Sequence, residues 1–203
     1  MATSGTASGP RRAARDDRRE EILAVAARLF AERGFHGVSV DDLGAAVGLT
    51  GPALYRYFAG KDALLTDMLV GISETLLDGG RERSEQAADP ESALAALVAW
   101  HVDFALDHPD LIAVQFRDLD NVPEPGRSRV RQLQARYVEL WVAALAGTGD
   151  GVDPARARAA VHAALGLINS TPHSARVGRD EMAGLLRDMA GAALAASAGT
   201  RVP

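Results

Sequence analysis

Residues 48–61 read GLTGPALYRYFAGK, and this stretch decides the fold that the sequence predicts. Gly48 is a typical helix stop, because glycine adopts a left-handed backbone without strain. The Thr50 hydroxyl can cap a new helix, and Pro52 would occupy its first turn, where the missing amide costs little. The stretch therefore predicts a tight turn followed by a short helix with the sequence GPALYRYF.

Two further helices are predicted before this turn. In residues 20–35, EEILAVAARLFAERGF, apolar side chains recur at three- and four-residue steps and form one stripe, and Gly34 then favours a stop. Ser39 can cap the next segment, with Asp42 three residues later in the position of a capping box. Short helices joined by a tight glycine-containing turn are typical of a helix-turn-helix unit. The sequence thus predicts a three-helix unit of this kind.

The entry of the last helix suits close approach to DNA. Gly51 and Ala53 add little bulk, so the helix terminus can come near the wall of a groove. Pro52 and the Ala53 methyl group offer apolar contact of the kind that a thymine methyl makes. Pro52 also has a purely structural reading, as a helix starter.

The residues that follow can bind the DNA backbone. The hydroxyls of Tyr55 and Tyr57 can donate to phosphate oxygens, and Arg56 and Lys61 add positive charge. The alternatives are a half-buried core position for Tyr55 and an ordinary solvated side chain for Lys61. We expect anchoring to outweigh base reading in this helix.

Composition restricts the chemistry of the chain. None of its 203 residues is cysteine, which excludes thiol nucleophiles and thiolate metal sites. No segment approaches the ~18 uncharged apolar residues of a membrane span, so we expect a soluble cytoplasmic protein. The net charge is −5, divided into +1 for residues 1–62 and −6 for the remainder. A DNA contact is therefore expected only in the N-terminal part.

Residues 1–19 are predicted to form a flexible basic arm. They contain glycine, serine and threonine and lack the apolar periodicity of a folded element. Such an arm could reach a minor groove, although a merely solubilising tail remains an alternative. Its basic residues are Arg11, Arg12, Arg15, Arg18 and Arg19.

The segment RLFAERGFHGVSVDDLGAAVGLTGPALYRYFAGKDALL, residues 28–65, resembles the DNA-binding domain of the TetR family of transcriptional repressors. The resemblance joins an aromatic-Gly-aromatic corner, the Ser-capped helix, the Gly-Leu turn, the Leu-Tyr-x-Tyr-Phe signature and the following lysine. It implies a homodimeric, ligand-responsive repressor that binds a palindromic operator and is released by a small, largely apolar effector. The candidate DNA-contacting residues are Ser39, Thr50, Gly51, Pro52, Ala53, Tyr55, Arg56, Tyr57 and Lys61.

The domain division that follows is 1–19 for the arm, 20–62 for the DNA-binding domain and 63–203 for an all-helical effector-binding and dimerisation domain. In the family, helices of the last domain surround an apolar cavity. The aromatic-rich candidates for its lining are Trp100, His101, Phe104, Phe116, Tyr137 and Trp141. These residues could equally pack as ordinary core. No spacing matches a zinc site, and we expect no metal and no cofactor.

The last two predicted helices, about 154–171 and 179–197, are rich in alanine and glycine. Small residues let helices approach closely, and the resemblance implies that this pair forms the two-fold dimer interface. A purely intramolecular core is the alternative. The candidate interface residues are Val161, Leu165, Ile168, Leu185, Leu186 and Met189.

A second functional hypothesis is a helical enzyme or small-molecule carrier with an incidental helix-turn-helix. Against it, the sequence offers no nucleophile-base pair, glycine-rich phosphate loop or metal spacing. We therefore expect a regulator and not an enzyme.

Overall fold

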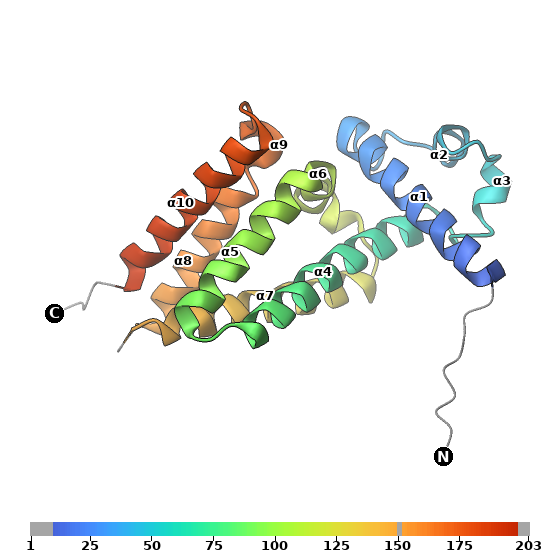
Figure 1. The fold of residues 1–203 in the computed structure, drawn as a ribbon. Coiled ribbons are helices and arrows are strands. Elements are labelled where there is room, and N and C mark those ends of the chain that lie inside the picture. The colour runs from blue at the N-terminus through green and yellow to red at the C-terminus, as the bar shows by residue number, and fades with distance from the viewer. Residues whose placement is uncertain (1–9, 150–151, 199–203) are drawn as a thin grey trace, which may run out of the picture.

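The computed structural model describes residues 10–149 and 152–198. All regular structure within these residues is helical, which confirms the predicted fold class (Figure 1). In chain order the elements are α1 (Pro10–Arg33), α2 (Val40–Ala46), α3 (Gly51–Leu54), α4 (Lys61–Gln86), α5 (Pro90–Asp107), α6 (Pro109–Asp118), the 3-10 helix η1 (Leu119–Asn121), α7 (Gly126–Gly147), α8 (Pro154–Ile168), α9 (Thr171–Ser174) and α10 (Arg179–Ala198).

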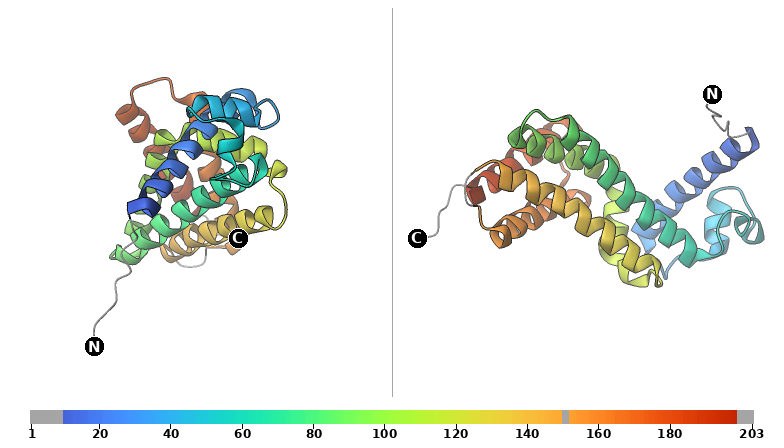
Figure 2. Two further views of the ribbon diagram at one scale, coloured as in Figure 1. Left: turned by 90° about the vertical axis from the view of Figure 1, so that its right-hand side faces the viewer. Right: turned by 90° about the horizontal axis from the view of Figure 1, so that it is seen from below.

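Helices α1 to α3 form a small unit at one end of an elongated molecule (Figures 1 and 2). Its core is aromatic and aliphatic, and the Phe30 and Phe35 rings meet edge to face with centroids 5.4 Å apart. Leu43, Leu54 and Phe58 are also buried there. Each short helix is thus held by one or two apolar anchors on a common core.

Helix α4 leaves this unit and runs on into the C-terminal helical domain, where it packs along α5 and α7. Helices α8 and α10 pack together on the far side of α5 (Figure 1). Leu64 and Leu65, near the start of α4, are fully buried, and so is Trp141 on α7. None of the helices within the described ranges is long and apolar enough to cross a membrane.

The prediction of a flexible arm over residues 1–19 is wrong for residues 10–19. Helix α1 already begins at Pro10 and continues without interruption to Arg33. The added turns consist mainly of arginine and alanine, which favour helix, and proline is well tolerated at a first helical position. Residues 1–9 lie outside the described part of the chain. The predicted boundary after residue 62 also falls inside the continuous helix α4.

Two helix ends differ from the prediction. Helix α3 ends at Leu54, and the next residues form tighter turns, with the Arg56 amide donating to Ala53 O (3.2 Å) and the Tyr57 amide to Leu54 O (2.9 Å). Helix α8 ends at Ile168, and Pro172 lies in the first turn of the separate short helix α9.

Candidate nucleic-acid interface and internal cavity

The helix-turn-helix is fixed by the caps that the sequence predicts. Ser39 Oγ accepts a hydrogen bond from the Asp42 amide (3.1 Å), and the Asp42 carboxylate accepts one from the Ser39 amide (2.9 Å). The Ser39 hydroxyl also donates to this carboxylate, and this bond, followed by the one from the Ser39 amide, holds the pKa of Asp42 below its ordinary value. Thr50 Oγ1 accepts from the Ala53 amide (3.4 Å) at the start of α3. Both hydroxyls are therefore already used in starting helices.

The backbones of α2 and α3 approach very closely at the turn. Gly48 adopts a φ of +66°, and the Leu49 amide donates to Gly44 O (2.8 Å). A Cβ on Gly44 would lie 2.8 Å from Leu49 O and 3.1 Å from Gly51 N. Gly51 is itself buried, and a Cβ there would meet Asp41 Oδ1 at 2.2 Å. The candidate DNA-contacting role of Gly51 is therefore corrected, because this residue is covered and its small size serves the packing of α3 on α2.

The side chains that follow Gly51 form an exposed ridge. Pro52 and Arg56 are exposed, Ala53 and Tyr57 are half-buried, and Tyr55 is 56% exposed. We call Pro52, Ala53, Tyr55, Arg56 and Tyr57 the recognition ridge. It is anchored from below by the buried side chains of Leu54 and Phe58. The alternative reading of Tyr55 as a core residue is wrong.

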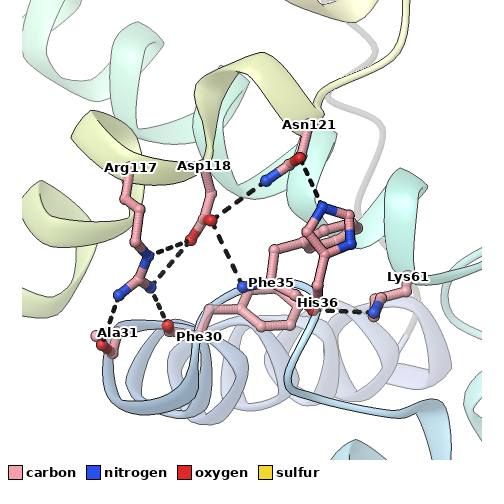
Figure 3. Close-up of polar contacts among 8 residues, drawn as sticks. All are labelled: Phe30, Ala31, Phe35, His36, Lys61, Arg117, Asp118 and Asn121. Atoms are coloured by element: carbon pink, nitrogen blue, oxygen red, sulfur yellow. Dashed lines mark hydrogen bonds and ion pairs between the residues drawn. The ribbon is translucent and has the colours of Figure 1, made fainter.

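Lys61 has a structural role that the sequence did not reveal. Its ammonium donates to Phe35 O (2.9 Å; Figure 3). It also donates to Val38 O (2.8 Å) and lies 4.4 Å from the centre of the Phe35 ring. A lysine ammonium has three N–H donors, so one remains for another acceptor. Lys61 thus fastens the loop after α1, and its contact with phosphate stays a prediction.

Three arginines of the predicted arm bind the helix-turn-helix from α1, two of them at the recognition ridge and one at the end of α2. Arg15 donates to Arg56 O (3.1 Å), and Arg18 donates to Val47 O. Arg19 donates to Tyr57 O and to the Asp67 carboxylate (2.6 Å), and its guanidinium stacks 4.3 Å from the centre of the Phe58 ring. A role of Arg18 and Arg19 in a loose minor-groove arm is therefore excluded. The Arg12 side chain, by contrast, is exposed, and its ion pair is with Asp16 on the same helix, with 4.0 Å between Nε and Oδ2.

The two domains meet where the end of α6 contacts the end of α1. The Arg117 guanidinium donates to Ala31 O (3.1 Å), to Phe30 O and to the buried Asp118 carboxylate (3.0 Å). Asp118 in turn accepts from the Phe35 amide (3.5 Å) and from Asn121 Nδ2 (3.2 Å). Figure 3 shows this cluster, which also includes a 2.9 Å contact between His36 and Asn121. We call Arg117, Asp118 and Asn121, together with the end of α1 and the loop that they contact, the α6 joint.

A cavity of about 380 Å³ opens in the C-terminal domain among α4, α5, α6, α7 and α8. Its mouth carries the exposed side chains of Phe116, Asp120 and His162. Its remaining lining is Ser73, Leu76, His101, Gln115, Leu119, Gln134, Tyr137, Val138, Leu165, Gly166 and Asn169. The lining is therefore a mixture of aliphatic and uncharged polar groups.

A hydrogen-bonded chain lies in the lining. The chain consists of Tyr137, His101 and Asn169. The Tyr137 hydroxyl donates to His101 Nδ1 (3.3 Å), and His101 Nε2–H donates to Asn169 Oδ1 (3.0 Å), so each side chain has a partner. Burial lowers the pKa of His101 to about 4, against the opposing effect of Asn169. Burial also raises the pKa of Tyr137 above its ordinary value. Both rings are therefore uncharged at neutral pH.

Half of the predicted ligand-binding residues line the cavity. His101, Phe116 and Tyr137 do so. Trp100 does not, because its indole N–H donates to Leu76 O (3.2 Å) and its ring is covered by Arg83, 4.0 Å away. Phe104 and Trp141 are buried in the helical core. For these three residues the structure supports the alternative of core packing.

The polar part of the lining could not be predicted from the sequence. Gln115, Gln134 and Asn169 carry no spacing signal, and only the fold brings them together. Asn169 is the residue that follows α8, and its amide N–H accordingly donates to Leu165 O (2.9 Å).

Two other hollows lie in the same domain. One, of about 670 Å³, is bounded by α5, the end of α7 and α10, and it ends at Gly149, next to residues outside the described part of the chain. The other, of about 290 Å³, is a shallow cleft between the end of α8 and the first half of α10. No predicted ligand-binding residue lines either of them.

The predicted interface residues divide into two groups. Val161, Ile168 and Leu186 are at most 2% exposed, so they have no surface to bury against a second chain and this part of the prediction is corrected. The period of each helix places them on the inner face instead. Leu185 and Met189 are 49% and 47% exposed and line the shallow cleft. Leu165 lines the internal cavity.

Comparison with known proteins agrees with this geometry. Residues 22–68 match the family described as bacterial regulatory proteins, tetR family, and residues 87–173 match the tetracyclin repressor-like C-terminal domain. The HTH-type transcriptional repressor KstR2 of Rhodococcus jostii is 30% identical over 136 residues, which are 66% of this chain and 67% of KstR2. This chain belongs to the TetR family. As a TetR protein it is a DNA-binding transcriptional regulator, and the hypothesis of an enzyme with an incidental helix-turn-helix is rejected.

Two other proteins are also similar to this chain. The HTH-type transcriptional activator FasR of Mycolicibacterium smegmatis is 28% identical over 162 residues, 80% of this chain and 72% of FasR. The crystal structure of AibR in complex with isovaleryl coenzyme A and operator DNA aligns with a TM-score of 0.71 at 20% identity, over 85% of this chain and 97% of AibR. At that identity the likeness to AibR shows the fold alone.

Proposed function

We propose that this TetR protein is a cytoplasmic homodimeric repressor that binds a palindromic operator and releases it when a small effector enters the 380 Å³ cavity. The observation that carries the proposal is the recognition ridge, which exposes Tyr55 and Arg56 above the buried anchors Leu54 and Phe58. A tyrosine that is half exposed on a short, rigidly held turn has little packing role. Its hydroxyl is free to donate to a phosphate oxygen.

Charge supports docking through this end of the molecule. Residues 1–62 carry a net +1, whereas the rest of the chain carries −6. Electrostatic attraction to DNA therefore orients the N-terminal unit toward the duplex and the C-terminal domain away from it. Arg56 lies in the ridge, and its side chain has no partner among the described residues.

A dimer supplies the second half-site. A single helix-turn-helix makes few contacts, and two-fold dimers place two recognition elements on successive turns of the groove. The exposed residues Val177, Leu185 and Met189 form an apolar patch over the shallow cleft between α8 and α10. We place the dimer interface there, because large apolar side chains gathered on one face favour association.

The α6 joint would pass an effector signal to the DNA-binding domain. Phe116 lines the mouth of the cavity, and the next residue, Arg117, holds the carbonyl end of α1. An effector that moves this part of α6 changes the support of α1 and hence the position of the recognition ridge. The effector must bind more tightly to the arrangement that releases DNA.

An operator search tests the proposal. The promoter DNA beside the gene for this protein is divided into overlapping duplexes, and binding is measured by fluorescence anisotropy over a range of salt concentrations. We expect one duplex with a palindromic site to bind far more tightly than the others. Its affinity should fall steeply as salt rises, because phosphate contacts release counterions. Equal affinity for every duplex would contradict sequence-specific regulation.

A further inference from the structure

We infer that the cavity is built for a compact, uncharged ligand that has an apolar body and at least one O–H or N–H donor, such as an alcohol or a primary amide. The inference rests on the proposed function, in which this cavity is the effector site. It adds the chemical class of the effector, which follows from the charges, hydrogen bonds and size of the lining.

Among the described residues, the lining holds no permanent positive charge. Among the described residues that line the cavity, none is lysine or arginine. Arg83 on α4 stacks on Trp100 and donates to Gly79 O (2.9 Å), outside the lining. His101 is neutral because burial lowers its pKa. A carboxylate or phosphate placed inside would lose hydration without gaining a counter-charge, which is strongly unfavourable.

The mouth is also unfavourable to anions. Asp120 places a carboxylate there, and its exposed partner Arg131 lies 3.5 Å away. Because Arg131 is paired with Asp120, its charge is already compensated and does little to favour an anionic ligand at the mouth. Entry of a neutral molecule past Phe116 and Asp120 meets no such electrostatic barrier.

The polar groups of the lining favour a ligand that carries a hydrogen-bond donor. Gln115 Oε1 is buried and has no hydrogen-bond partner within the described part of the chain. Leaving a buried acceptor unpaired is unfavourable, so a ligand O–H or N–H that reaches it would be strongly favoured. Asn169 Oδ1 is already occupied by His101, which leaves the Asn169 amide N–H groups to donate to a ligand oxygen. An alcohol or primary amide has both kinds of group.

The size and the apolar walls define the remainder of the ligand. A volume of about 380 Å³ is at the lower end of the range for small-molecule sites. Leu76, Val138 and Leu165 supply aliphatic surface between the polar groups. The ligand is therefore a small molecule with most of its surface apolar.

A set of probes that share one carbon skeleton tests the class directly. Octanol, octanamide, sodium octanoate, octyl phosphate and methyl octanoate are titrated into the full-length protein by calorimetry at neutral pH. We expect octanol and octanamide to bind at least about tenfold more tightly than the two anions, and more tightly than the ester, which has no donor. An anion that binds as tightly as octanamide would overturn the inference. So would the failure of all five probes to bind.

Two variants and one control locate the effect in the cavity. Gln115→Leu removes the unpaired acceptor and should weaken octanol and octanamide by about tenfold, while methyl octanoate changes little. Gln132→Leu, at an exposed position of α7 outside the lining, should change none of the affinities. Gln134→Arg introduces a cation and should allow octanoate to bind. Equal losses for the alcohol and the ester in Gln115→Leu would contradict the donor requirement.

The ligand class and the proposed function can fail independently of each other. The calorimetry contains no DNA, whereas the operator assay needs no ligand. Operator binding together with a preference for anions would overturn only the ligand class. The expected preference without any operator binding would overturn the proposed function and leave the ligand class standing.

Discussion

Single residues in the DNA-binding unit have roles that depend on where their hydrogen-bond acceptors lie. Arg19 and Lys61 carry charges that the sequence assigns to DNA, yet both donate to backbone carbonyls inside the unit. Arg56 has the same charge and stays free on the recognition ridge. Residue type alone could not separate these cases, because the acceptors belong to turns far away in the sequence.

At the same scale, Gly44→Ala tests the close approach of α2 and α3. The new Cβ would lie 2.8 Å from Leu49 O, a backbone atom that cannot rotate away. We expect a loss of about 1–3 kcal/mol in the free energy of unfolding, the usual cost of overpacking. The matched control is Gly71→Ala, within α4, where a Cβ meets nothing within 4 Å.

Urea unfolding measures both glycine variants. Gly71→Ala should be neutral or stabilising by up to about 1 kcal/mol, since alanine favours helix. Equal stability of the two variants would show that the turn relaxes and that Gly44 is not required for packing.

A pH dependence is expected from His101. Its pKa is about 4 in the folded protein and 6.5 in the unfolded chain, so between these values the unfolded state binds more protons. Stability therefore falls as pH decreases through this window, by about 3 kcal/mol in total. Chemical unfolding of the wild type at several pH values should show this loss. Carboxylates with lowered pKa values add their own loss at still lower pH.

The His101→Gln variant isolates the effect, because it lacks the titrating ring. Its stability should fall less than that of the wild type between pH 6.5 and 4. His173→Gln, at an exposed position, should behave as the wild type does. Parallel pH profiles for the wild type and His101→Gln would refute the assignment.

At the scale of elements, local signals predicted the short helices well. The Ser39 and Thr50 caps and the Gly48 turn are confirmed, because each depends on neighbours within a few residues. The N-terminal extension of α1 was missed. The apolar stripe of α1 begins only at Ile22. The turns before Ile22 are held in place because Arg18 and Arg19 donate to Val47 O and Tyr57 O, which lie far away in the sequence. Periodicity cannot reveal such support.

The α6 joint is an element-scale feature that Arg117→Ala should disrupt. Removing the guanidinium leaves the Phe30 and Ala31 carbonyls and the buried Asp118 carboxylate with fewer partners. Hydrogen exchange measured by mass spectrometry should become about tenfold faster in the peptide covering residues 30–38. Arg136→Ala, at an exposed site on α7 without an ion pair, is the control and should leave this peptide unchanged. Unchanged exchange in Arg117→Ala would show that the contact does not support α1.

For the whole molecule, the sequence predicted the two-domain plan but only part of the cavity. Aromatic residues were chosen as candidates, and half of them pack in the core, since large rings fill space wherever helices meet. The polar lining comes from residues scattered over the chain, such as Ser73 on α4, Gln115 on α6 and Asn169 after α8. Its assembly depends on how α4 to α8 cross, which no local pattern encodes.

The proposed dimer is tested by Leu185→Asp combined with Met189→Asp. Both side chains are about half exposed, so the change should not unfold the chain. It should convert the dimer to a monomer in sedimentation experiments, because two charges would be buried without partners at the interface. Ala135→Asp, at an exposed position of α7, should remain dimeric. A dimer that persists in the double variant would move the interface elsewhere.

The central claim is that the recognition ridge grips DNA, and operator affinity of the Tyr55→Ala, Arg56→Ala double variant tests it most directly. Both side chains are exposed, so folding should be retained, with Arg136→Ala as the matched surface control. We predict that the double variant binds the operator more weakly by about 1–3 kcal/mol and with a salt dependence shallower by about one, while Arg136→Ala matches the wild type. Wild-type affinity and an unchanged salt dependence in the folded double variant would contradict the account.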